Sequence, residues 1–89
     1  MEIRVGKVTH YYDRIGVAVL DLTGALKVGD PIHILGRTTD FNQQVKSMEI
    51  EHHKIQSAEP GMEVALRVYG TVRKGDIIYK LKGEQPGQT

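Results

Sequence analysis

Short runs rich in Val and Ile, separated by glycine-containing turns, recur along the chain, and no segment shows a sustained helical period. Of the 89 residues, 17 are Val or Ile, which favour the pleated, half-buried surface of a sheet over a helix. We therefore interpret the chain as all-β. Six strands are expected, at residues 2–12, 15–22, 30–36, 43–52, 62–69 and 76–81.

The apolar pattern also predicts how these strands bend. Val5 and Val8 differ in parity across Gly6, which indicates a bulge or sharp bend there. The fourth run shows a similar shift between Val45 and Met48. Bent strands curl around a shared interior, and small antiparallel domains commonly close to remove their edges. The predicted architecture is a small six-stranded closed or nearly closed antiparallel β-barrel.

The fifth run has the clearest alternation in the chain. Its apolar residues are separated by single residues that face the other way, the pattern of a strand with one face on a core and one in water. The residues expected to face the core are Met62, Val64, Leu66 and Val68.

Length and charge bound the domain organisation. A chain of 89 residues makes one domain and buries roughly 60–65% of its unfolded surface, so a binding module is expected before an enzyme. We assign residues 1–81 to the barrel and 82–89 to a flexible tail. The chain has no cysteine and no apolar leader segment, and a cytoplasmic location without membrane association is expected.

A near-repeat is the most informative local feature. Leu26-Lys27-Val28-Gly29-Asp30-Pro31-Ile32 parallels Val72-Arg73-Lys74-Gly75-Asp76-Ile77-Ile78. In each copy glycine supplies the positive φ of a tight turn, and the aspartate is placed to accept from nearby backbone amides as the chain enters a strand. The repeat predicts two equivalent strand-entry turns.

The order of these stretches resembles domain 2 of the translational GTPases, the β-barrel of elongation factor Tu and its relatives. The residues on which this resemblance rests are 16–20, 24–36, 45–48, 58–66 and 73–76. The chain is also similar to the C-terminal barrel of collagenase-like peptidase-family proteins. The resemblance to domain 2 implies a β-barrel with a translation-related role. The first hairpin, between Gly16 and Gly24, is shorter than in elongation factor Tu, and that factor's tRNA-contacting residues have no counterparts that can be matched individually.

Catalytic chemistry is not expected. The segment 24–29 has P-loop-like glycine spacing, but Asp30 stands where the phosphate-binding lysine should be, so no GTP hydrolysis is expected. Glu49, Glu51 and His53 would share one face of an extended strand and are the best metal candidates, although alternate charges are more often a solvated face. We predict no catalytic residue, no metal and no cofactor.

A small basic patch is the candidate binding site. The net charge is only +1, but residues 61–89 carry five basic and three acidic side chains. Arg67 and Tyr69 have the outward parity of the fifth run, and Arg73 and Lys74 sit in the following turn. Such residues can grip phosphates while the tyrosine stacks on a base. The competing interpretation is a solvated face that keeps an edge strand from pairing.

Tyr11, Tyr12 and Arg14 form a weaker version of this patch at the first hairpin. Two functions therefore remain open. One is a non-catalytic module that weakly binds RNA or a ribonucleoprotein surface in a translation-related role. The other is a protein–protein interaction module, or an accessory to a larger enzyme such as a collagenase-like peptidase-family protein.

Overall fold

The computed structural model describes residues 2–81, and within that range every regular element is a strand. No helix in this part of the chain is long and apolar enough to cross a membrane. The ten strands are β1 (Glu2–Tyr12), β2 (Val17–Leu22), β3 (Leu26–Lys27), β4 (Pro31–Leu35), β5 (Asp40–Gln44), β6 (Met48–Ile50), β7 (His53–Ile55), β8 (Ser57–Ala58), β9 (Glu63–Arg67) and β10 (Ile77–Leu81).

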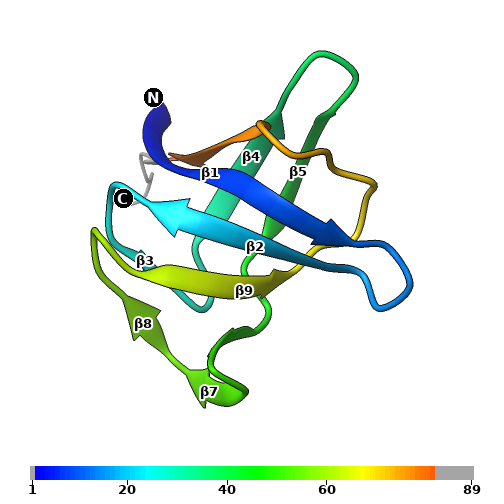
Figure 1. Ribbon diagram of the computed structural model, residues 1–89. Helices are drawn as coiled ribbons and strands as arrows, with labels where there is room; N and C mark the ends of the chain where they lie inside the picture. The colour runs from blue at the N-terminus through cyan, green and yellow to red at the C-terminus, as the bar shows by residue number, and fades with distance from the viewer. Residues whose placement is uncertain (1, 82–89) are drawn as a thin grey trace.

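Eight strands form one antiparallel sheet, and β3 and β8 form a separate antiparallel pair. The order in the main sheet is β5-β4-β10-β1-β2-β9-β6-β7. The sheet curls, so that β4 and β5 lie behind β1 and β2 (Figure 1). The all-β, antiparallel prediction is confirmed.

The prediction of a six-stranded closed or nearly closed barrel differs from the structure in two respects, the number of strands and the closure of the sheet. First, the expected run 43–52 is divided among β5, β6 and a turn, because β5 pairs with β4 whereas β6 pairs with β7 and β9. Short pairs such as β3–β8 add further strands. Second, backbone pairing leaves the main sheet open, with β5 and β7 as its edges in the described residues.

One side chain bridges part of that opening. Gln43, on β5, donates from Nε2 to the carbonyl of Arg67 over 2.9 Å and accepts at Oε1 from the amide of Tyr69 over 2.8 Å. The amide side chain thus completes two backbone hydrogen bonds where no strand is available. These two exposed hydrogen bonds tie the segment that follows β9 to β5.

The predicted bends are present. The register of β1 against β10 shifts between Arg4 and Gly6, and Val5 and Val8 are both buried. In β9 the alternation also holds for its buried residues, but Met62 was predicted to face the core and is exposed. It lies in the turn before β9, where its carbonyl accepts from Leu22.

The interior is filled by apolar side chains from both halves of the curled sheet. Each is at most 4% exposed, as expected of a close-packed core. The core residues are Val5, Val8, Ala18, Leu20, Leu22, Leu26, Ile32, Ile34, Val45, Met48, Ala58, Val64, Leu66, Val68, Val72 and Ile78.

The near-repeat folds into two matching turns. Gly29 and Gly75 have φ of 98° and 97°, a conformation that glycine adopts without strain. Asp30 Oδ2 accepts from the Lys27 amide over 2.9 Å, and Asp76 Oδ2 accepts from the amide three residues before it over 2.8 Å. Each turn also makes two backbone hydrogen bonds with a buried valine, the first turn with Val45 and the second with Val8. The prediction of equivalent strand-entry turns is confirmed.

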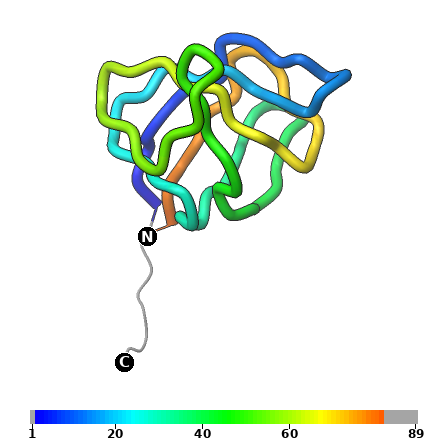
Figure 2. The backbone as a smooth tube through the Cα atoms, turned by 90° about the horizontal axis from the view of Figure 1, so that it is seen from below, coloured from blue at the N-terminus to red at the C-terminus, as the bar shows by residue number. Residues whose placement is uncertain are grey.

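The two ends of the described chain lie side by side. Glu2 of β1 pairs with Leu81 of β10, and Figure 2 shows the start of β1 next to the end of β10. The predicted tail, 82–89, lies outside the described residues, as does Met1.

Candidate functional site

The first half of the predicted basic patch is an exposed cation–aromatic pair. The guanidinium carbon of Arg67 lies 5.7 Å from the centre of the Tyr69 ring. This distance is within the range of a cation–π interaction. Both residues are exposed, as the alternation of the run predicted, and Gln43, which the sequence did not indicate, anchors the backbone of both.

The second half of the patch forms a different surface. Arg73 and Lys74 occupy the turn before β10 and line a hollow of about 310 Å³ together with Arg37. Arg67 instead lines a smaller hollow with Val17. The fold therefore divides the four predicted residues into two pairs and adds Arg37 to the second, because the hairpin after β4 approaches the Gly75 turn.

The weaker patch at the first hairpin is also divided. Tyr11 packs against the core, whereas Tyr12 is 50% exposed. Tyr12 lies near His10, with ring centres 5.9 Å apart, and it lines another hollow with Ile15.

That hollow belongs to an apolar groove on the outer face of β2, β9 and β6. Its floor is made by half-buried Val17, Val19 and Ala65. One lobe, of about 430 Å³, ends at Tyr12 and Ile15, which is 61% exposed. A second lobe, of about 440 Å³, shares part of this floor and reaches Met62, Glu63 and Ile50. We call this continuous surface the β2–β9 groove.

Carboxylates form the rim of the β2–β9 groove. Glu49 and Glu51 line both lobes, and Glu63 lines the second. None of the three carboxylates makes an ion pair within residues 2–81. Arg67 borders the groove floor, since it is paired with Val17 and lines a small hollow with Val17, Ala65 and Glu49. The groove thus combines an apolar floor with three carboxylates that make no ion pair within residues 2–81, while Arg67 and Lys54 flank it on the Glu49 side.

The β6–β7 turn at this rim has an uncommon backbone. Glu51 and His52 have φ of 51° and 68°, although such left-handed pairs usually contain glycine or asparagine. Each non-glycine residue in this region carries strain of about 1–3 kcal/mol. Both residues line the first lobe of the groove.

The same turn removes the metal site that the sequence suggested. Glu49, Glu51 and His53 would share a face only on a continuous strand, but β6 ends at Ile50 and the chain reverses. Within residues 2–81, no cluster of three or more histidine or acidic side chains is arranged to hold a metal ion.

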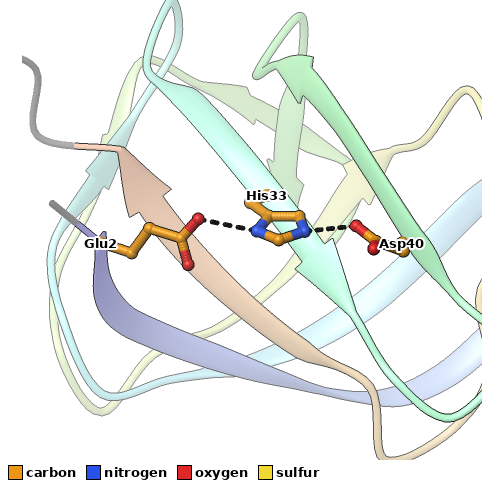
Figure 3. A network of polar contacts seen from close by, with 3 residues as sticks. All are labelled: Glu2, His33 and Asp40. Carbon is orange, nitrogen blue, oxygen red and sulfur yellow. Dashed lines mark hydrogen bonds and ion pairs between the residues drawn. The ribbon is translucent and has the colours of Figure 1, made fainter.

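A charged cluster that sequence reasoning missed surrounds His33. Its Nδ1 lies 2.8 Å from Glu2 Oε2, and its Nε2 lies 2.6 Å from Asp40 Oδ1 (Figure 3). Only a protonated imidazole donates from both nitrogens. The hydrogen bonds to Asp40 and to Glu2 raise the pKa of His33 above its ordinary value of 6.5, against a smaller opposing effect of burial. Strand pairing supplied these neighbours, which no sequence spacing revealed.

We expect the contribution of His33 to stability to depend on pH. Because its folded pKa is raised, the contribution is fully present below pH 6.5 and is lost as pH rises through the folded pKa. Urea unfolding of wild type and His33→Gln at several pH values measures this difference. His53→Gln, at an exposed histidine, is the matched control. A stability difference for His33→Gln that stays constant or grows as pH rises contradicts the prediction.

Together, the curled antiparallel sheet, the filled interior and the surface grooves define a small all-β domain that presents its chemistry on its outer faces. Comparison with known proteins shows which proteins contain similar domains. No protein-family model matches the chain, but individual proteins and structures do.

The chain is similar to a peptidase-related protein. It is 39% identical over 82 residues to an uncharacterized protease from Methanocaldococcus jannaschii, in an alignment that covers 91% of this chain and 20% of that protein. It matches the crystal structure of the C-terminal domain of a protein assigned to the U32 peptidases, from Geobacillus thermoleovorans. That match has a TM-score of 0.83 and 20% identity, and covers 91% of this chain and 93% of that one. The structural match shows a common fold.

The chain is also similar to part of elongation factor 1-alpha. It is 32% identical over 78 residues to the factor from Desulfurococcus mucosus, covering 79% of this chain and 17% of that protein. The factor from Pyrococcus horikoshii is 38% identical over 71 residues, covering 75% and 16%. The chain thus spans about a fifth or less of the curated relatives it matches. The resemblances to an elongation-factor domain and a peptidase C-terminal domain are confirmed.

Proposed function

We propose that this β domain is a non-catalytic protein-interaction module that serves a larger enzyme of the kind represented by its peptidase relatives. The observation that carries the proposal is the pattern of coverage. The alignment with the M. jannaschii protease covers 91% of this chain but only 20% of that protein. The chain also corresponds to nearly all of a separately crystallised C-terminal domain. A domain that accompanies other domains acts through its surface, and protein interfaces are built from apolar centres with polar rims.

An affinity experiment tests this function. Immobilised protein is incubated with a lysate of its own organism, with and without nuclease, and each retained protein is then purified and titrated against the isolated chain. We expect at least one partner that survives nuclease and binds directly. If every retained protein disappears after nuclease treatment, the protein-interaction function is wrong.

RNA binding is a second candidate, favoured by the exposed Arg67–Tyr69 pair and by the basic hollow at Arg37, Arg73 and Lys74. An arginine, a stacking aromatic ring and nearby cations are the groups that hold single-stranded nucleic acid. Titration with short single-stranded RNA at low salt should shift the backbone amides of residues 67–74, and raising the salt should reverse the shifts. An unchanged spectrum at low salt removes this candidate.

A further inference from the structure

We propose that the β2–β9 groove binds an extended segment of a partner protein in which apolar side chains alternate with lysine or arginine. This inference rests on the proposed function and specifies where the module binds and what chemistry it recognises. The partner segment lies against the outer face of the sheet, with its apolar side chains on the floor and its cations at the rim.

The floor favours an extended ligand. Val17 and Val19 are alternate residues of β2 on the same outer face. Ala65, on β9, is paired with Val19 and lies beside it. Alternate residues of a strand are about 7 Å apart, and so are alternate side chains of an extended peptide. Every second side chain of such a peptide therefore meets the apolar floor.

The ends of the groove supply further apolar contact. Tyr12 and Ile15 rise at one end and Met62 at the other, exposed by 50%, 61% and 41%. Large apolar side chains gathered around one depression, with a polar rim, are characteristic of a recognition surface. A tyrosine and a methionine are also residue types enriched at interfaces.

The rim selects the charge of the ligand. Glu49, Glu51 and Glu63 carry negative charge around the floor and have no ion-pair partner within residues 2–81. Lysine or arginine side chains between the apolar ones leave the peptide on the face away from the floor, but their long flexible stems let the charged ends bend to the rim carboxylates. Phosphate groups are repelled by these three carboxylates, which distinguishes the acidic part of the groove from the basic hollow at Arg37, Arg73 and Lys74.

A short synthetic peptide tests the inference directly. Its sequence alternates valine and lysine, its termini are blocked, and a second peptide alternates valine and glutamate. Each is titrated into the whole chain while backbone amide shifts are followed. We expect the lysine peptide to shift the amides of Val17, Val19 and Ala65, and the glutamate peptide to leave them unchanged. No shift in the groove with the lysine peptide at about 1 mM, which corresponds to a binding free energy of about −4 kcal/mol, overturns the proposal.

Charge reversal tests the rim. Glu63→Lys and Glu49→Lys are each expected to weaken binding of the lysine peptide by about fivefold or more, since they replace attraction by repulsion. Glu59→Lys makes the same change in charge at an exposed position outside the groove and should alter the affinity by less than about twofold. Equal affinities for all four proteins overturn the proposal, and amide spectra confirm that each variant is folded.

The groove and the proposed function can fail separately. A nuclease-resistant partner that binds wild type and Glu63→Lys equally well leaves the protein-interaction function intact and rejects this groove as its site. Short RNA that shifts the same groove amides also rejects the groove proposal. Conversely, the absence of any nuclease-resistant partner counts against the proposed function itself.

Discussion

Leu66→Ala should lower the free energy of unfolding by about 2–5 kcal/mol, because it removes a large buried side chain and leaves a cavity. Leu66 is 0% exposed, and its residue on β9 pairs with Ala18 on one side and Met48 on the other. The lost packing therefore lies where β2, β9 and β6 meet. For a chain of 89 residues the total stability is about 4–13 kcal/mol, so this single change removes a large fraction of it.

Urea unfolding, followed by circular dichroism, measures the Leu66→Ala effect. The matched control is Leu35→Ala, because Leu35 is 36% exposed on β4 and its removal should cost less than about 1 kcal/mol. Similar losses for the two variants would contradict the assignment of Leu66 to the centre of the core.

Gly36→Ala should destabilise the domain by about 2–4 kcal/mol through a steric conflict with a turn that is distant in sequence. A Cβ at Gly36 would overlap Oδ1 of Asp76 and lie 2.6 Å from its Cγ. Asp76 is 4% exposed, and its other carboxylate oxygen accepts from the Arg73 amide over 2.8 Å. The carboxylate must move to make room, which weakens that hydrogen bond.

A double-mutant cycle isolates this conflict. Asp76→Ala removes the overlapping oxygen, so in that background Gly36→Ala should cost at least about 1 kcal/mol less than it does in wild type. Thermal or urea unfolding of the four proteins gives the coupling. If the two effects simply add, the close approach of Gly36 and Asp76 does not determine the stability of this turn.

The sequence predicted those parts of the fold that depend on local pattern. Alternating Val64, Leu66 and Val68 identified β9, the parity change around Gly6 identified the bulge, and the Gly-Asp repeat identified two matching turns. Each signal reflects a constraint that acts within a few residues, namely side-chain alternation or the φ of a glycine.

Features that depend on distant partners could not be predicted in this way. The amide of Gln43 replaces backbone pairing with residues more than twenty positions away, and His33 meets its two carboxylates only after β4 is flanked by neighbouring strands. The break after β5 likewise arises because β5 pairs with β4 whereas β6 pairs with β7 and β9. The predicted number of strands was wrong because strand ends that depend on distant partners leave no local pattern in the sequence.

The groove left a signal that could have been used. Val17, Ala18, Val19 and Leu20 form a continuous apolar run, whereas a strand with one solvated face should alternate. Val17 and Val19 are the residues on the outer face. A run without alternation predicts that both faces of the strand are covered, and the groove proposal assigns the outer cover to the partner segment.

The pairing of Glu2 with Leu81 determines how the domain responds to mechanical load. Force that enters at one end of the described chain and leaves at the other pulls β1 and β10 apart across their ladder. In this geometry the interstrand hydrogen bonds break one after another, whereas strands pulled along their axes would have to break them together. The domain therefore yields to tension by peeling open from the β1–β10 end, and His33, bonded to Glu2, sits where that peeling begins.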